Sequence, residues 1–186
     1  HLGMVLFALL MLNKTSWNGA ILQSLSHGFM TALFFALIGM IYGRTHTRDI
    51  TKLGGLLKVM PFISVIYVIA GMASLGLPGF SGFVAEMNIF VGAFQHEGMF
   101  YRVATIISVS AIVVTAVYIL RVLGIMLMGE VKNEEFLDLP KATWFEITGI
   151  LLLLIPMLGM GVAPLWLSDM TMESLEPFIQ GVLNHL

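Results

Sequence analysis

Long apolar stretches separated by short polar segments dominate the chain. Residues 17–42, 103–128 and 143–165 each reach the length of about 20 mostly apolar residues that a transmembrane helix needs. Residues 59–94 are also apolar but are too long for one span, and Gly76, Pro78 and Gly79 lie in their middle. Because proline cannot donate a backbone hydrogen bond and glycine adds backbone freedom, this stretch predicts two half-helices around a break.

The two ends of the chain show different patterns. Residues 2–12 are apolar for only 11 positions, which predicts the tail of a helix and a C-terminal piece of a longer protein. In residues 168–186, Ser174 is the predicted N-cap of a helix with Pro177 in its first turn, and apolar side chains recur at helical spacing: Leu175, Phe178, Ile179, Val182 and Leu186. We expect an amphipathic interfacial helix packed on its own bundle; docking to another subunit is the alternative.

Composition places these helices in a membrane. Hydrophobic residues make up 58% of the 186 positions and charged residues only 11%, too few to cover a soluble fold. The net charge of −2 excludes a basic surface for nucleic acid, and the absence of Cys excludes thiolate chemistry and Cys-ligated metal centres. Phosphate-loop, dinucleotide and Ser-His-Asp motifs are also absent, so no cofactor or metal site is predicted in this chain.

Basic residues predict the orientation in the membrane. The connections 43–58 and 129–142, together with the adjoining Arg121, carry seven of the nine Lys and Arg residues, whereas the other side has only Lys14 and Arg102. The positive-inside rule therefore puts loops 43–58 and 129–142 in the cytoplasm and the C-terminus outside.

Two ionisable side chains, His27 and Glu86, fall deep within predicted spans. An ionised carboxylate at the bilayer centre costs about 2.5–3.5 kcal/mol, so a proton or ion pathway is the leading hypothesis for both residues. The alternative for Glu86 is a neutral acid bonded to carbonyls freed at the break. For His27 the alternative is a polar contact between helices.

Neighbouring polar residues extend the site around His27. Gln23, Ser24 and Thr31 share a stripe with His27 on the helix 17–42, and such a stripe can hold the chain of waters that proton transfer needs. Helix 103–128 has a similar but weaker face, formed by Thr105, Ser108, Thr115 and Tyr118. Serine and threonine also occur in membrane helices for packing alone.

Three runs make the chain similar to a known family: Ser26-His27-Gly28, Gly43-Arg44-Thr45-His46-Thr47-Arg48-Asp49-Ile50, and the segment from Leu75 to Glu86. They closely resemble subunit M, the chain 4 type, of proton-pumping NADH:quinone oxidoreductase (respiratory complex I). The Thr-His-Thr-Arg-Asp run at 45–49 distinguishes this subunit from its antiporter-like siblings. The resemblance covers essentially the whole chain.

The resemblance implies an all-α integral membrane fold, an antiporter-like helix bundle with one broken transmembrane helix at 59–94. Residues 1–128 would be part of the second inverted repeat, from the end of helix 10 through helix 13. Residues 129–186 would be the last transmembrane helix and the amphipathic tail. The family's proton-path roles carry over to Glu86 and His27, and to His1 on helix 10.

The same resemblance implies a place in a larger assembly. The partners would be other membrane subunits of complex I, especially neighbouring antiporter-like subunits, in a bacterial inner membrane. NADH, FMN, iron–sulfur clusters and quinone would bind to other subunits, so this chain alone should have no redox activity. The alternatives are an Mrp-type cation/proton antiporter or membrane-bound hydrogenase subunit, and a purely structural membrane segment with no ion path.

Overall fold

The computed structural model describes residues 1–183, and these residues form helices and no strand. The elements are α1 (Leu2–Leu10), α2 (Lys14–Thr45), α3 (Leu56–Val59), α4 (Pro61–Ser74), α5 (Ser81–Phe94), α6 (Met99–Leu127), the 3₁₀ turn η1 (Glu134–Phe136), α7 (Trp144–Val162) and α8 (Leu165–Leu183). The predicted all-α class is confirmed.

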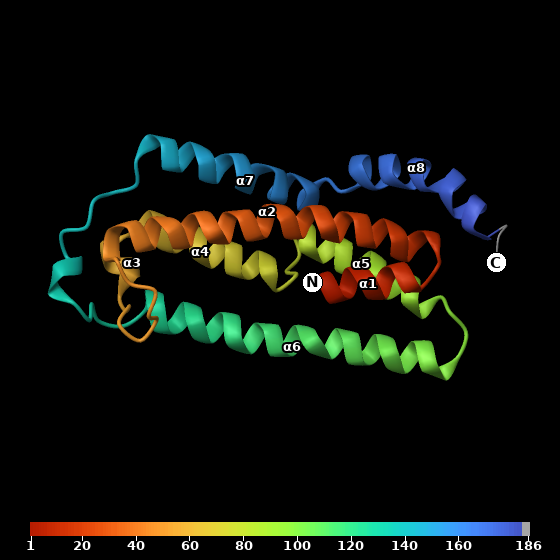
Figure 1. The fold of residues 1–186 in the computed structure, drawn as a ribbon, viewed down its shortest axis with the longest axis horizontal. Coiled ribbons are helices and arrows are strands. Elements are labelled where there is room, and N and C mark those ends of the chain that lie inside the picture. Colours follow the sequence, from red (N-terminus) through yellow and green to blue (C-terminus); the bar gives the residue numbers. More distant parts are fainter. Residues whose placement is uncertain (184–186) are drawn as a thin grey trace.

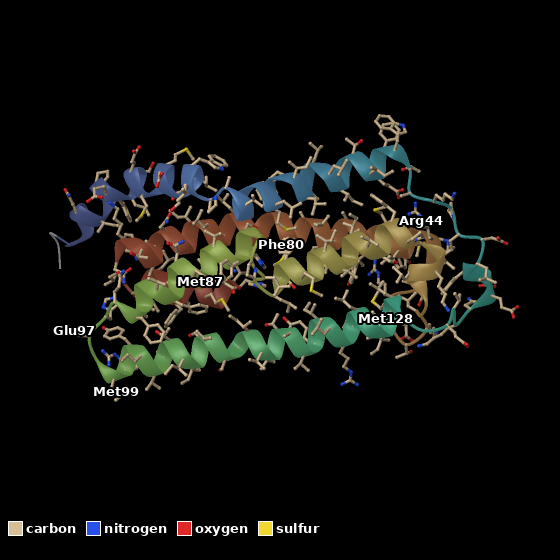
Figure 2. All side chains as sticks on the ribbon, turned by 180° about the vertical axis from the view of Figure 1, so that it is seen from behind. Arg44, Phe80, Met87, Glu97, Met99 and Met128 are labelled. Atoms are coloured by element: carbon tan, nitrogen blue, oxygen red, sulfur yellow. The ribbon has the colours of Figure 1, made fainter. Side chains whose placement is uncertain are left out.

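The helices lie along one common axis. In Figure 1, α4 and α5 follow each other along one side of α2, α7 and α8 follow each other along another side, and α6 runs the length of the molecule. Figure 2 shows Arg44 and Met128 at one end of the bundle, Glu97 and Met99 at the opposite end, and Phe80 between them. These are called the Arg44 end and the Glu97 end below.

The predicted spans correspond to these helices. Helices α2, α6 and α7 are each long and apolar enough to cross a membrane, and the stretch 59–94 is divided into two apolar half-helices, α4 and α5. Each half-helix has 14 residues, about 21 Å at 1.5 Å per residue, so the pair together approaches the length of α2. The outer face of α6 exposes a row of valines that suits contact with lipid: Val113, Val114 and Val117.

Helix α2 lies at the centre because small residues allow α5 to approach it closely. A Cβ atom on Gly19 of α2 would overlap the backbone of Ile89 and Ala85 in α5, and one on Gly92 of α5 would overlap Ser16. In a membrane, helices associate through such close packing, since lipid is as apolar as the side chains. Toward the Arg44 end, α2 instead shares an aliphatic core with α4 and α7, which includes Leu33, Leu37, Ile63, Ile150 and Met157.

The predicted start of the last helix is wrong. Helix α8 begins at Leu165, directly after Pro164, so Ser174 lies inside the helix, where its hydroxyl donates to the carbonyl of Met170, and Pro177 lies near the C-terminal end. The buried face starts earlier than the apolar pattern indicates, at Leu167, and continues through Thr171 to Leu175.

Packing of α8 on its own bundle is confirmed. Asn18 of α2 donates to Ser168 at 2.8 Å and accepts from Thr171, Lys14 pairs with Glu176, and the ring of Trp17 lies 5.6 Å from that of Phe178. Ile179 is half-buried, whereas the side chain of Val182 and the whole of Leu186 fall outside the described part of the chain.

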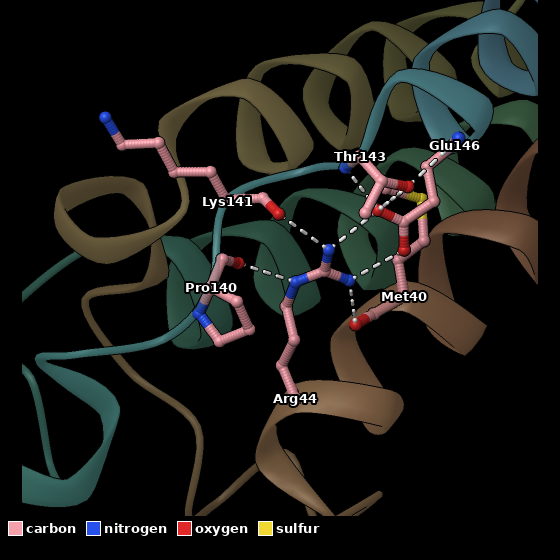
Figure 3. A network of polar contacts seen from close by, with 6 residues as sticks. All are labelled: Met40, Arg44, Pro140, Lys141, Thr143 and Glu146. Atoms are coloured by element: carbon pink, nitrogen blue, oxygen red, sulfur yellow. Dashed lines mark hydrogen bonds and ion pairs between the residues drawn. The ribbon is translucent and has the colours of Figure 1, made fainter.

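At the Arg44 end, one guanidinium joins α2 to the segment that enters α7 (Figure 3). Arg44 donates to both carboxylate oxygens of Glu146, at 2.9 and 2.7 Å, and to the carbonyls of Met40, Pro140 and Lys141. Glu146 also closes a capping box with Thr143, which begins α7. The arginine therefore fixes both the start of α7 and the last residues of the preceding loop.

We predict that Arg44→Lys loosens this loop although it keeps the charge. A lysine cannot provide the planar guanidinium that donates to a carboxylate and three carbonyls together. The free energy of unfolding should therefore fall by about 1.5–3 kcal/mol. Limited proteolysis by trypsin at Lys132 and Lys141 should become faster. Arg121→Lys, on the exposed face of α6, is the matched control. Equal cleavage rates in the two variants would contradict the role of Arg44.

A second prediction concerns the contact between α2 and α5. Alanine is favoured over glycine in a helix by about 1 kcal/mol, and Gly39→Ala should keep that gain because nothing lies within 4 Å of the added Cβ. Gly19→Ala should instead cost about 1–3 kcal/mol, because α5 must move away. The Tm of the detergent-solubilised protein should therefore rise in Gly39→Ala and fall in Gly19→Ala. A rise in Tm for both variants would show that the helices do not depend on this close approach.

Candidate functional site

The break between α4 and α5 lies at mid-length of the bundle. Helix α4 ends at Ser74 and α5 begins at Ser81, and the intervening residues form two tight turns in which Gly76 has φ +61° and Gly79 has φ +97°. These left-handed conformations favour glycine, and Pro78 between them cannot continue a helix. The predicted break at Gly76, Pro78 and Gly79 is confirmed.

Glu86 lies in the second turn of α5, with its carboxylate turned back against the break. The residue is only 5% exposed. A Cβ atom on Gly76 would overlap the carboxylate oxygens, so the absence of a side chain at Gly76 makes the space that the carboxylate occupies. The acid and the break are thus one structural unit.

His1 lies between the end of α4 and Glu86. Its Nε2 atom is 3.2 Å from the carbonyl oxygen of Ser74, one of the carbonyls that the break leaves without a helical partner, and 3.8 Å from Oε1 of Glu86. One imidazole nitrogen therefore faces both a freed backbone carbonyl and the buried acid.

His27 completes a row of three ionisable side chains. Its ring centroid lies 5.6 Å from that of His1. Within the described residues, Nδ1 of His27 and Oε1 of Gln23 are buried and have no hydrogen-bond partner. Gln23 is 1% exposed and precedes His27 by one helical turn, on the same face of α2. Two buried polar atoms without a partner on one face are a suitable place for bound water.

The other predicted lining residues turn their hydroxyl groups toward their own helix. Ser24 is exposed and donates to the carbonyl of Ala20 at 2.8 Å, and Thr31 donates to the carbonyl of His27 at 2.7 Å. On α6, the hydroxyls of Thr105, Ser108 and Thr115 likewise bond to carbonyls four residues earlier. Such bonds satisfy the hydroxyl locally.

Two supports of the break are not among the sequence-predicted residues. Ser26 of α2 and Ser81, the first residue of α5, bond through their hydroxyl oxygens at 2.7 Å. On the other side, Gly161 of α7 lies so close to the backbone of Gly79 and Phe80 that a Cβ atom would overlap it. The Gly-Met-Gly run at 159–161 is a sequence signal for such close packing, although it does not indicate the partner.

The Thr-His-Thr-Arg-Asp run at 45–49 lies at the Arg44 end, far from the break, where Thr45 is the last residue of α2 and residues 46–49 begin the following loop. His46 adopts a left-handed conformation with φ 51°, and the guanidinium of Arg48 lies 4.7 Å above the ring of Tyr42. The Thr51 hydroxyl and backbone N–H both donate to Asp49 and lower the pKa of its carboxyl.

The fold and this site define a class: an antiporter-like membrane helix bundle with a discontinuous helix whose break holds a buried acid and histidines. The chain belongs to the family described as "NADH:quinone oxidoreductase/Mrp antiporter, TM", which matches residues 1–115.

Curated relatives agree with this assignment. The chain is 37% identical over 169 residues to NAD(P)H-quinone oxidoreductase chain 4 3 of Trichormus variabilis, and 34% identical over 164 residues to NADH-quinone oxidoreductase subunit M of Rickettsia conorii. Each comparison covers 88% of this chain and 32% of the relative, so the chain spans about a third of their length.

Solved structures share the fold. Respiratory complex I from Thermus thermophilus with bound NADH contains a chain that matches with a TM-score of 0.82 at 24% identity, over 96% of this chain and 36% of that one. The Mrp complex from Dietzia sp. matches with a TM-score of 0.79 at 21% identity, over 97% of this chain and 42% of that one.

We predict that Gly76→Ala is more destabilising than Gly79→Ala. Both alanines would be strained by a positive φ, at about 1–2 kcal/mol, but only a Cβ at Gly76 would also meet Glu86. A double-mutant cycle isolates that contact: in a Glu86→Ala background the additional cost of Gly76→Ala should disappear, which corresponds to a coupling energy of about 0.5–3 kcal/mol. A coupling energy of zero from thermal unfolding would mean that the carboxylate does not lie against the break.

Proposed function

We propose that this chain supplies part of a proton path to subunit M, the chain 4 type, of a proton-translocating NADH:quinone oxidoreductase. The observation that carries the proposal is the row formed by Glu86, His1 and His27 at the break of the discontinuous helix. Ionisable groups at membrane depth are costly, and three together are the usual mark of a proton relay.

The geometry suits stepwise proton transfer. At 3.8 Å, Nε2 of His1 and Oε1 of Glu86 are slightly too far apart for a direct hydrogen bond, so a small movement or one bridging water would connect them. A proton arriving on His1 stabilises ionised Glu86 by Coulomb attraction in this buried site, and its departure makes the neutral acid the favoured form. Glu86 and His1 would thus alternate in holding one proton.

The path would continue along α2. His27, whose ring centroid is 5.6 Å from that of His1, receives the proton from it, and Gln23 extends the polar face by one turn toward the Glu97 end. The buried Nδ1 of His27 and Oε1 of Gln23 supply an acceptor for water on this face. Ser24 and Thr31 would play no direct part, because their hydroxyls are bonded to their own helix.

The redox components of the proposed complex would lie in other subunits. In the proposed complex, other subunits bind NADH, FMN, the iron–sulfur clusters and quinone, and this chain performs no redox step. Its partners would be other membrane subunits, neighbouring antiporter-like subunits among them. We further propose that the Arg44 end faces the cytoplasm of a bacterial cell, because seven of the nine Lys and Arg residues lie at that end, and that the C-terminal segment is on the outer side.

The relatives favour this function over an Mrp-type antiporter or hydrogenase subunit. The family description covers both quinone oxidoreductases and Mrp antiporters, but the curated relatives at 34–37% identity are named as NAD(P)H-quinone oxidoreductase subunits. A purely structural role is disfavoured by the energetic cost of burying Glu86.

We predict that Glu86→Gln in the intact complex abolishes proton translocation while the complex still assembles. Glutamine keeps the size and the hydrogen-bonding oxygen but cannot release a proton. Coupled turnover should fall about 10²–10⁴-fold, because that is the usual contribution of a positioned acid or base to proton transfer. Protons moved per NADH oxidised would be measured in membrane vesicles.

Glu97→Gln is the matched control, because Glu97 is an exposed acid at the end of the bundle. It should leave translocation unchanged. Wild-type stoichiometry and turnover in Glu86→Gln would refute the proposed path. A normal path together with cation-dependent antiport and no NADH-linked activity would instead favour the Mrp-type alternative.

A further inference from the structure

An open groove lies at the Arg44 end, away from the break. One wall is the start of α4 and the other is the segment that enters α7, and both walls pack on α2. The groove has a volume of about 390 Å³ and is lined mainly by apolar residues, among them Val59, Phe62, Ile63, Ala142 and Ile147. A single acyl chain has the shape and polarity to fill a groove of this kind.

Aromatic side chains mark the depth of the groove in the membrane. Trp144 and Phe145 begin α7 and are 65% and 69% exposed, with ring centroids 3.7 Å apart. Exposed aromatic residues at the end of a transmembrane helix lie at the level of the lipid headgroups. Ile147 is less than one turn further along α7, so the groove begins at the headgroup level and extends toward the acyl chains.

The charges around the groove are positive. Lys141 lines it, and Lys58 is exposed on α3 beside the lining residue Val59. The acid in the first turn of α7, Glu146, is held by both nitrogens of the Arg44 fork and is therefore neutralised. Asp138 precedes this segment but does not line the groove.

We propose that this groove binds an anionic phospholipid. The phosphate group pairs with the ammonium group of Lys141, which lines the groove, and one acyl chain packs along Phe62 and Ile147. Lys58, the exposed neighbour of the lining residue Val59, adds a second positive charge. Basic pockets between helices at the headgroup level are suited to anionic lipid headgroups, because phosphate gains Coulomb attraction and the acyl chain loses no apolar contact. The site does not depend on the proton path.

The test uses the intact detergent-solubilised complex after removal of lipid. Titration with fluorescently labelled phosphatidylglycerol should show one saturable site that phosphatidylcholine displaces poorly. The Lys58→Gln/Lys141→Gln variant should weaken this site about 30-fold, given the usual contribution of a lysine near an anionic surface. Lys52→Gln/Lys132→Gln removes two lysines from the same two loops but outside the groove, and should leave the affinity unchanged.

A second variant tests the apolar half of the site. Ala142→Trp fills the groove while both lysines remain, and should prevent binding of the labelled lipid. Equal affinity in the charge variant and its control, or equal affinity for phosphatidylcholine, would overturn the proposal. It would also be overturned if a photo-crosslinking residue at position 142 labelled only protein and no lipid, because another polypeptide would then occupy the groove.

Discussion

A helix that unwinds in the middle of a membrane must find a partner for every backbone group it frees, and the structure around residues 75–80 is organised by that requirement. Some partners are local: the N–H of Gly76 bonds to the carbonyl of Ala73, and the N–H of Phe80 to that of Leu77. Others come from distant parts of the chain. His1 reaches the carbonyl of Ser74, and Ser26 holds the first residue of α5. Helix α7 covers the remaining side, where Gly161 permits contact with the backbone of the break. His1 at the start of α1, Ser26 of α2 and Gly161 of α7 therefore support the unwound segment together.

The same requirement concentrates the ionisable groups at this point. An imidazole that satisfies a freed carbonyl is already at membrane depth, and its position beside Glu86 lowers the cost of burying the acid. The missing side chain of Gly76 then allows the carboxylate to turn toward the break instead of toward lipid. The side chains that support the break, His1 and Glu86, are thus the same ones that form the proposed proton path.

Features with a local signal could be predicted from the sequence. Pro78 and the glycines on either side of it indicate the break. An acid or a histidine within an apolar run is also conspicuous, so Glu86 and His27 could be identified as candidate site residues from the sequence. For His1, the family resemblance implied a role in the proton path. Its position between Glu86 and His27 was not predicted, because its partners Ser74 and Glu86 are 73 and 85 residues away. The start of α8 was missed because Thr171 reads as polar in a hydrophobic pattern, although it is buried through its bond to Asn18. The polar stripe on α2 groups Ser24 and Thr31 with His27, but periodicity cannot show that Ser24 is exposed or that both hydroxyls bond to their own helix.

Helix α4 extends from the apolar groove at the Arg44 end to the polar break at the middle of the bundle. Its first residue, Pro61, lies in the groove between α4 and α7, and its last residue, Ser74, presents the carbonyl that His1 contacts. Between them, Ala70 and Ala73 are buried and Gly71 is in close contact with Leu123 of α6, so neighbouring helices hold α4 along its length. An intact α-helix of 14 residues has a fixed length of about 21 Å. The carbonyl of Ser74 that His1 contacts is therefore positioned by the packing of the whole half-helix and not by the residues of the break alone.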